Sequence, residues 1–265
     1  PQITTSGRGS EDFKPILDFD AAKALFSDET LRVCSDFEKP TPIQAHCWSV
    51  LDAGRDIVGV AETGSGKTLA FLLPAFKHIR NEREKNPKKK KPTVLVLAPT
   101  RELAQQTDEV CVDERVAARS VVICGGMSKR DQLQALRKGV DIVVGTPGRL
   151  LSLVEEKTLN LSEVTYLVLD EADRMLDFGF EEDVRAIINA VPKKRQTAMF
   201  SATWPESVRK LAHEFFADPI KITVGTDDLN AAQTVTQIVE VVEPRNKSRR
   251  LLQLLRKYHT PDNEK

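Results

Sequence analysis

A glycine-rich turn that ends in a lysine and a threonine is the clearest chemical feature of this sequence. Residues 61–68 read AETGSGKT, directly after the apolar run 56–60 and directly before the helical stretch 69–79. Backbone N–H groups of such a turn, at the start of a helix, converge on a phosphate. The lysine can then reach the outer phosphates, and the threonine hydroxyl can bind Mg²⁺. The strict pattern begins with Gly where Ala61 stands. Rather than an ordinary Gly/Ser turn, we predict a phosphate site made by Thr63, Gly64, Ser65, Gly66, Lys67 and Thr68.

Two neighbouring carboxylates could complete such a site. Residues 165–173 read TYLVLDEAD, so Asp170 and Glu171 follow an apolar run. A carboxylate at the end of a strand can hold Mg²⁺ through water, which suits Asp170. Glu171 is then placed to orient and deprotonate an attacking water. The alternative is a helix N-terminal turn enriched in acids, which the helix dipole also favours.

The segment 37–44, FEKPTPIQ, supports two interpretations. Thr41, Pro42 and Gln44 form a good helix start, with an N-cap hydroxyl, a proline at the first helical position and a capping-box glutamine. These residues alone favour a capping role for Gln44 over contact with a ligand.

Apolar segments that alternate with helical segments indicate the fold. Most of the apolar runs are near-continuous, as expected for strands covered on both faces. The alternation predicts an α/β fold with a doubly wound, mostly parallel sheet and helices on both faces, and its ligand sites at the carboxyl ends of strands. The runs are 56–60, 93–98, 120–125, 141–145, 165–169, 197–201 and 220–224, and the helical stretches between them include 101–115, 128–138, 181–190 and 206–216.

Two polar segments interrupt this order. Residues 80–91, RNEREKNPKKKK, carry seven basic and two acidic side chains, 7 − 2 = +5, and Pro87 and Pro92 predict a loop there. That loop could be a solvated insertion, an auxiliary RNA tether or a nuclear import signal. Residues 226–234 suggest a linker, after which 235–242 and 248–258 suggest a strand and a helix of a second domain over 235–265.

The composition limits the classes of partner. The chain has 39 Lys plus Arg and 39 Asp plus Glu among 265 residues, so overall charge does not draw it to a polyanion, and any such site must be local. It has no apolar run of about 18 residues, and its four cysteines show no CxxC spacing. We therefore expect a soluble, unsecreted protein with no membrane association and no metal cluster.

Seven motifs in a fixed order resemble the DEAD-box family of ATP-dependent RNA helicases. They are FEKPTPIQ (37–44), AETGSGKT (61–68), PTRELA (99–104), GG (125–126), TPGR (146–149), DEAD (170–173) and SAT (201–203). The resemblance implies that residues 1–225 form a RecA-like domain of the P-loop NTPase type that binds ATP and Mg²⁺. Segments such as SATWPESVR (201–209) look most like fungal nucleolar DEAD-box helicases of large ribosomal subunit assembly.

The resemblance also implies roles for residues outside the phosphate loop. Gln44 would read the adenine edge, Phe19 would stack on the base, and Lys39 would belong to the same nucleotide site. Two positions differ from the family pattern, which usually has Gly where Asp36 stands and Gln where Glu62 stands. Lys67, Asp170 and Glu171 are the expected catalytic residues, with Thr68 and Asp170 holding the magnesium.

RNA contact is expected along one rim of the sheet. PTRELA, GG and TPGR each follow a predicted strand, and amides, hydroxyls and guanidiniums suit phosphate and ribose without reading bases. Plain turn chemistry explains the glycines equally well, and strand-end hydroxyls explain SAT. By resemblance, the RNA-backbone contacts are Thr100, Arg101, Gly126, Thr146 and Arg149. The resemblance further implies that Asp173, Ser201 and Thr203 couple hydrolysis to strand separation.

The expected function is that of an ATP-dependent RNA helicase or RNA–protein remodeller. It would act as a monomer on pre-ribosomal RNA in the nucleus and nucleolus, or otherwise in the cytoplasm. Because the family's arginine finger lies in its second domain, residues 1–265 alone should bind nucleotide and hydrolyse it feebly. The alternatives are a non-catalytic RNA clamp or scaffold, a metabolic phosphate-loop kinase and a DNA helicase.

Overall fold

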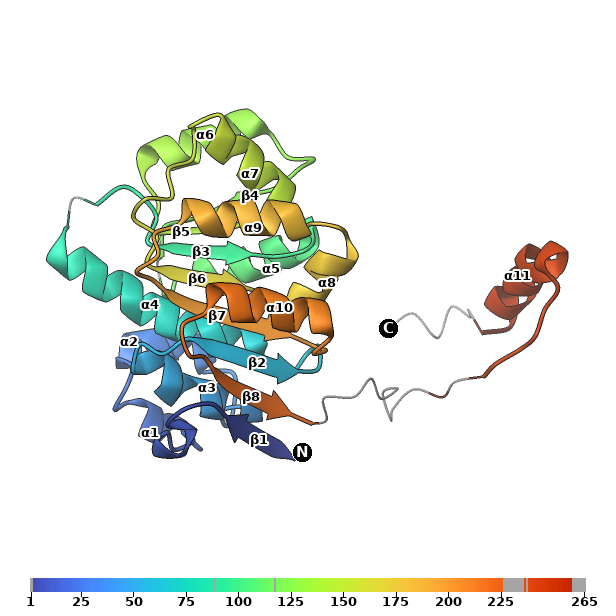
Figure 1. Cartoon of the computed structure of the whole chain (residues 1–265), viewed down its shortest axis with the longest axis horizontal. Coiled ribbons are helices and arrows are strands. Elements are labelled where there is room, and N and C mark those ends of the chain that lie inside the picture. Colours follow the sequence, from blue (N-terminus) through green and yellow to red (C-terminus); the bar gives the residue numbers. More distant parts are fainter. Residues whose placement is uncertain (1, 88, 117, 226–235, 237, 259–265) are drawn as a thin grey trace. The chain divides into compact units, whose positions relative to one another are not determined.

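The computed structural model describes residues 2–87, 89–116, 118–225, 236 and 238–258 (Figure 1). The chain divides into two compact units, residues 1–229 and 230–265, and each is described by itself. The linker predicted at 226–234 lies outside the described residues.

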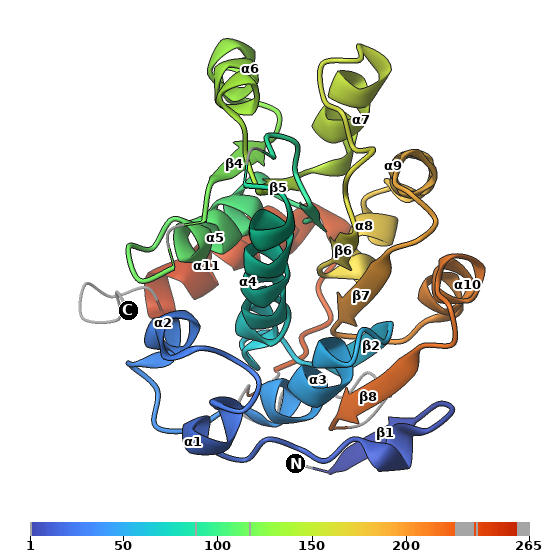
Figure 2. The ribbon, with the colours of Figure 1, turned by 90° about the vertical axis from the view of Figure 1, so that its left-hand side faces the viewer.

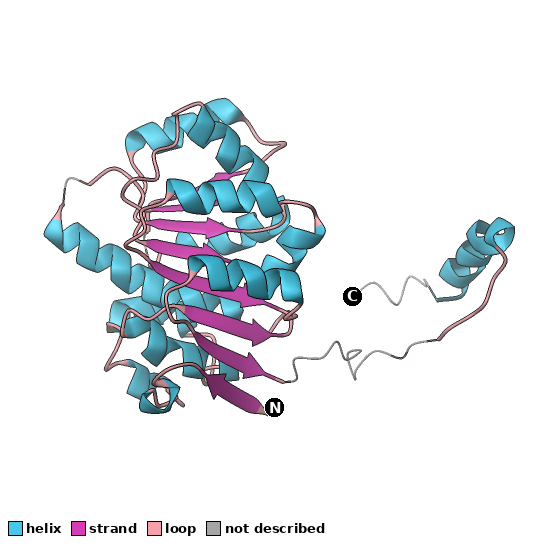
Figure 3. Cartoon of the chain, in the orientation of Figure 1, coloured by secondary structure: helices cyan, strands magenta, loops and turns pink. Residues whose placement is uncertain are grey.

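One sheet organises the first unit (Figures 1 and 3). Its strands are β1 Ile3–Ser6, β2 Ile57–Ala61, β3 Val94–Leu97, β4 Ser120–Ile123, β5 Ile142–Gly145, β6 Tyr166–Leu169, β7 Gln196–Ser201 and β8 Ile220–Val224. Their order across the sheet is β1-β8-β2-β7-β6-β3-β5-β4. Every neighbouring pair is parallel except β1 with β8. The predicted doubly wound, mostly parallel sheet is therefore confirmed.

Helices cover both faces of the sheet (Figure 2). One core packs α3, α4 and α5 against the strands, and a second core packs α7, α8, α9 and α10 against the opposite face. The helices of the first unit are α1 Phe19–Ala22, α2 Asp28–Leu31, α3 Pro42–Asp52, α4 Lys67–Lys85, α5 Arg101–Cys111, α6 Lys129–Lys138, α7 Pro147–Glu155, α8 Ala172–Asp177, α9 Glu181–Ala190 and α10 Glu206–Phe215, with short 3₁₀ turns at Ser10–Asp12 and Arg32–Cys34.

The strands that carry the predicted site residues are fully buried. All four residues of β3, β5 and β6 are inaccessible, and so are all five of β2. Burial on both faces explains why these strands read as continuous Val, Ile and Leu runs rather than as alternating patterns. Edge strand β1, with sequence ITTS and three exposed residues, carries no such run and was not predicted.

The loop predicted over residues 80–91 is wrong for its first half, because α4 continues to Lys85. Arg80 pairs with Glu84, and Glu82 pairs with Lys85, across one helical turn. Arg, Glu and Lys are good helix formers, and pairs at this spacing stabilise an exposed helix by about 0.2–0.5 kcal/mol each. Absence of apolar residues therefore did not mean absence of helix.

The described part of the lysine run, residues 89–91, contacts the protein near the amino-terminal ends of the parallel strands. The Lys89 ammonium lies 2.9 Å from Glu82 Oε2, and Lys91 lies 3.1 Å from Glu163 Oε1. The backbone N–H of Val140, just before β5, donates to the carbonyl of Lys90 at 3.1 Å. Lys88 lies outside the described residues. Thr146 lies beyond the other end of β5, so this loop and the predicted RNA rim occupy opposite ends of the same strand.

The second unit contains helix α11, Lys247–Tyr258, as predicted, preceded by a 3₁₀ turn at Pro244–Asn246. The strand predicted at 235–242 is not found at the described residues 236 and 238–242. A strand needs a neighbour for its backbone hydrogen bonds, and no other extended segment is present in the described part of this unit. No helix in the described parts of the chain is both long enough and apolar enough to span a bilayer.

Candidate nucleotide and RNA site

The glycine-rich turn joins β2 to α4, as the sequence predicts. Gly64 and Gly66 have φ angles of +81° and +90°, a left-handed conformation that glycine adopts without steric cost. The Ser65 hydroxyl donates to the Glu62 carbonyl at 2.7 Å and braces the turn. Gly66 precedes the first residue of α4, so the turn's backbone lies at the positive end of a 19-residue helix.

Lys67 is the buried cation of the site, with 6% of its surface exposed. Its ammonium donates to the carbonyls of Ala61 at 2.7 Å and Glu62 at 3.0 Å. Burial lowers the pKa of Lys67, and the nearby carboxylates of Asp170 and Glu171 oppose that change. Lys67 is therefore held inside the turn by two neutral carbonyls, which an anionic phosphate can replace.

Asp170 and Glu171 stand at the end of β6. Asp170 is 6% exposed, and burial raises its pKa to about 6, against the attraction of Lys67. Glu171 has φ +48°, a strained conformation for a residue with a side chain, and it precedes the first residue of α8. Its carboxylate accepts a hydrogen bond of 3.0 Å from Arg174. Backbone strain of this kind is characteristic of functional sites.

Asp173 links the start of α8 to the end of β7. One of its carboxylate oxygens accepts hydrogen bonds from the Thr203 backbone at 3.0 Å and the Thr203 hydroxyl at 2.7 Å. Its own N–H donates to the Ser201 hydroxyl at 3.3 Å. The structure thus brings together the three residues predicted to couple hydrolysis to RNA.

Gln44 acts as a helix cap and also contacts the phosphate loop. Its amide oxygen accepts from the Thr41 N–H at 2.9 Å, which is the predicted capping contact. Its amide nitrogen donates to the Gly66 carbonyl at 3.0 Å. The buried Thr41 hydroxyl completes this capping box at the Gln44 backbone and lies beside Gly66. The predicted capping role is therefore confirmed, and contact of Gln44 with adenine stays a prediction.

The other residues predicted for the adenine region are less tightly placed. Phe19 is half-buried, and its ring centroid lies 6.3 Å from that of Trp48 on α3. Lys39 is exposed. Asp36, the departure from the usual glycine, pairs with Arg115 at 3.1 Å. Ser65 and Lys67 both donate hydrogen bonds to the backbone carbonyl of Glu62. These bonds do not involve the side chain, so glutamate in place of the family's usual glutamine leaves them intact.

The predicted RNA residues gather beyond the adjacent strands β3, β5 and β4. The Thr146 N–H donates to the Ile123 carbonyl at 3.0 Å, which joins the ends of β5 and β4. A Cβ at Gly126, where φ is +76°, would lie 3.4 Å from the Arg101 guanidinium. Thr100 caps α5, accepting from Leu103 N–H at 3.3 Å. One guanidinium nitrogen of Arg149 is buried without a hydrogen-bond partner.

These residues fit a nucleotide with a divalent cation. The donor set combines a buried ammonium, the amides of a glycine turn and the hydroxyl of Thr68, which suits phosphates. The buried Asp170 carboxylate supplies the oxygen ligand that Mg²⁺ prefers. The Thr41 hydroxyl and the Gln44 amide add polar groups beside the same loop.

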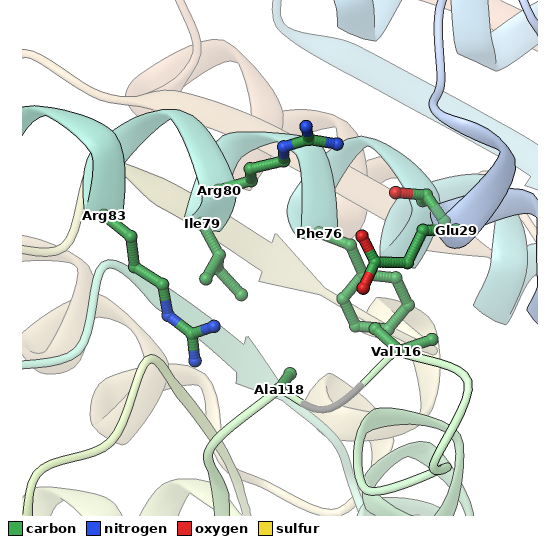
Figure 4. Close-up of a pocket in the computed structure, with 8 residues that line it drawn as sticks. Glu29, Phe76, Ile79, Arg80, Arg83, Val116 and Ala118 are labelled. Atoms are coloured by element: carbon green, nitrogen blue, oxygen red, sulfur yellow. The ribbon is translucent and has the colours of Figure 1, made fainter. Parts of the chain in front are cut away.

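A hollow of about 210 Å³ lies elsewhere on the domain, between α2, α4, Val116 and Ala118 (Figure 4). Phe76 and Ile79 lie between the charged ends of Glu29, Arg80 and Arg83 there. It contains none of the motif residues, and Arg83 already pairs with Asp141. We therefore assign no part of the site to this hollow.

Two residues of the site were missed by the sequence reasoning. Arg174, which holds the Glu171 carboxylate, follows it by three residues at a helix start, and that spacing is a usable signal. Thr41 was predicted only as a cap, and the sequence carries no signal that its hydroxyl also lies beside Gly66.

Comparison with known proteins places this arrangement in a family. The chain is 49% identical over 264 residues to DEAD-box ATP-dependent RNA helicase 5 of Arabidopsis thaliana, covering 97% of this chain and 49% of the relative. It is 50% identical over 252 residues to ATP-dependent RNA helicase DBP3 of Saccharomyces cerevisiae, covering 93% and 47% respectively. The chain thus spans about half the length of the curated relatives it matches.

A solved structure shares the fold. The crystal structure of the yeast DEAD-box splicing factor Prp28 matches with a TM-score of 0.76 and 32% identity, covering 97% of this chain and 61% of that one. This match agrees with the predicted RecA-like architecture. The DEAD/DEAH box helicase model matches residues 41–211, which include the phosphate loop, the RNA rim and DEAD itself. The chain belongs to the DEAD/DEAH box helicase family.

Proposed function

We propose that this chain is the ATP-binding domain of an RNA helicase, in which ATP binding and hydrolysis drive local RNA unwinding or RNA–protein remodelling. The observation that carries the proposal is the Asp173 contact with Thr203, 2.7 Å from hydroxyl to carboxylate. Through it the helix that begins beside Glu171 is fixed to the end of the strand next to it. Because β6, β3, β5 and β4 are parallel neighbours, Asp170, Glu171 and the predicted RNA residues lie at the same end of the sheet.

In this proposal each residue of the site has a separate task. The amides of residues 63–66 and the Lys67 ammonium bind the phosphates, so Lys67 must leave the carbonyls of Ala61 and Glu62. Asp170 and Thr68 hold magnesium, which neutralises phosphate charge when bound. Glu171 accepts a proton from the attacking water at its carboxylate, one oxygen of which is held by Arg174.

We further propose that residues 1–265 alone bind nucleotide and hydrolyse it slowly. Two backbone carbonyls hold the Lys67 ammonium and Arg174 holds one oxygen of Glu171, so groups of the protein itself compete with ATP and water for these side chains. The relatives are about twice as long as this chain. An arginine supplied from another domain is typically worth about 10³–10⁵ in rate in phosphoryl-transfer enzymes.

The RNA substrate is proposed from chemistry and from the relatives. Amides, hydroxyls and two arginines contact RNA backbone without reading sequence. We also propose a monomer that acts on pre-ribosomal RNA in the nucleolus; the likeness to the helicases named DBP3 supports the RNA helicase class of this proposal.

The test is RNA-stimulated ATP hydrolysis, measured side by side on residues 1–265 and on the full-length protein. We expect strong RNA stimulation in the full-length protein only, and its loss in Glu171→Gln with ATP binding retained. Glu182→Gln, an exposed carboxylate of α9, serves as the matched control. Robust RNA-stimulated turnover by residues 1–265 would contradict the proposed slow hydrolysis.

The same variant separates the enzyme from a non-catalytic RNA clamp. A clamp that needs only to bind ATP should retain full cellular function with Glu171→Gln. Loss of cellular function together with hydrolysis supports the helicase.

A further inference from the structure

Strand β4 forms one edge of the sheet, and its outer side is open. It pairs with β5 on one side, and no strand among the described residues pairs with the other. In a parallel strand, the N–H and C=O of one residue point to the same side, and successive residues alternate. The Ile123 carbonyl accepts from Thr146 on the β5 side. The backbone groups of Ser120 and Val122 therefore point to the open edge.

A groove of about 400 Å³ runs along this edge. The strand forms its floor, α5 forms one wall and α6 forms the other, because these helices belong to opposite faces of the sheet. In Figure 2 the same two helices lie on either side of the β4 label. Such a groove matches the shape of an extended segment rather than that of a helix.

The walls of the groove carry one sign of charge. Asp108 and Glu109 of α5 and Asp131 of α6 line it, and its lining residues include no Lys or Arg. Asp108 hydrogen-bonds the Ser120 hydroxyl and so lies directly beside the strand. Three carboxylates favour a cationic occupant and repel the phosphates of RNA, which distinguishes this edge from the neighbouring rim.

A buried acceptor in the same groove has no hydrogen-bond partner. Gln132 of α6 is only 3% exposed, and its amide nitrogen donates to the Cys124 carbonyl at 3.0 Å. Its amide oxygen is buried without a hydrogen bond. An unsatisfied buried acceptor costs about 1–3 kcal/mol, so a donor that reaches it would be favoured.

We propose that an extended, lysine- or arginine-bearing segment of a partner protein adds to the β4 edge. Its backbone would pair with Ser120 and Val122, and its basic side chains would face Asp108, Glu109 and Asp131. Addition to an open strand edge obtains affinity from main-chain hydrogen bonds and specificity from alternate side chains. Met127, which follows Gly126 in the chain, lines the groove, so the occupant would lie near the predicted RNA contact.

The test uses residues 1–265 and a fluorescein-labelled peptide in which pairs of lysines alternate with pairs of valines, so that lysines lie on both faces of the added strand, followed by fluorescence anisotropy. We expect the combined variant Asp108→Asn, Glu109→Gln, Asp131→Asn to weaken binding about tenfold. Removal of three exposed carboxylates elsewhere, Asp28→Asn, Glu155→Gln and Glu182→Gln, should leave binding unchanged. A glutamate–valine peptide should not bind.

Two further measurements do not depend on how the groove variant folds. Two lysine–valine peptides are each methylated at every second backbone nitrogen, and they differ in which set of nitrogens carries the methyl groups. The peptide whose methyl groups replace the N–H groups that pair with β4 should lose binding. In hydrogen exchange, the amides of Ser120 and Val122 should slow on peptide binding, whereas those of Val121 and Ile123 should not change. Equal binding of all the peptides, no binding of the lysine–valine peptide, or unchanged exchange at Val122 would overturn the proposal.

Discussion

Alanine substitutions at the two glycines of the phosphate loop, Gly64 and Gly66, distinguish the effect of backbone strain from the effect of a side-chain contact. Both have positive φ, so alanine at either position strains the backbone by roughly 1–2 kcal/mol. A Cβ at Gly66 would also lie 2.6 Å from the Gln44 amide nitrogen, whereas a Cβ at Gly64 meets no atom within 4 Å. We predict that Gly66→Ala weakens ATP binding more than Gly64→Ala, although both lower the thermal midpoint. Equal losses of ATP affinity in calorimetry would show that the Gln44 contact is unimportant.

Asp170 should make magnesium-dependent nucleotide binding sensitive to pH. Burial raises its pKa to about 6, so the ionised form dominates above that pH and the neutral form below it. Only the ionised carboxylate holds magnesium. We predict that affinity for Mg·ATP falls as pH drops through about 6 and that Asp170→Asn binds weakly at every pH. An unchanged affinity of the wild type across this range would show that Asp170 does not hold the metal.

At the scale of elements, hydrogen bonds of Asp173 connect α8 to the end of β7. Thr203 gives Asp173 two hydrogen bonds, one of them from its hydroxyl to a buried carboxylate. Hydrogen bonds to charged groups contribute about 1.5–3 kcal/mol. We predict that Thr203→Val lowers the free energy of unfolding by this order in urea titrations, with ATP affinity unchanged. Thr158→Val is a useful comparison, because its hydroxyl bonds only the neutral Leu153 carbonyl.

Strand positions could be predicted because burial on both faces leaves a continuous apolar run, as in Tyr166–Leu169. Element ends were less predictable. α4 extends to Lys85 through exposed ion pairs that carry no apolar signal, and β1 is an edge strand with one half-buried residue in four. In both cases the deciding interactions are at the surface, where hydrophobic pattern gives no information.

The site divides in the same way. Lys67, Asp170 and Glu171 could be predicted because each follows a buried strand at a fixed spacing, and the sheet brings strand ends together. The contact of Gln44 with Gly66 joins residues 22 apart, and it depends on how α3 packs beside the loop. Such tertiary contacts leave no local pattern in the sequence.

At the scale of the whole domain, two groups of basic side chains lie at opposite ends of the parallel strands. The lysine run lies at the amino end of β5, where Lys91 pairs with Glu163, whereas Arg101 and Arg149 lie beyond the carboxyl ends of strands. Phosphate contacts set both affinity and its salt dependence.

We therefore predict that Arg101→Ala and Arg149→Ala each weaken binding of single-stranded RNA and reduce the salt slope by about 1. In contrast, Lys90→Gln with Lys91→Gln should change neither. RNA affinity at several salt concentrations in the full-length protein gives the comparison. A larger loss from the lysine pair would reassign the RNA surface to the other end of the sheet.

The central claim, that the turn after β2 is a nucleotide site served by a buried lysine, is tested most directly by Mg·ATP binding to residues 1–265. Lys67→Ala removes the buried charge that we propose binds the phosphates, and Lys14→Ala removes an exposed lysine of the same chain. We predict that isothermal titration shows ATP binding weakened at least about tenfold by Lys67→Ala and unchanged by Lys14→Ala. ATP binding that survives Lys67→Ala undiminished would contradict the account.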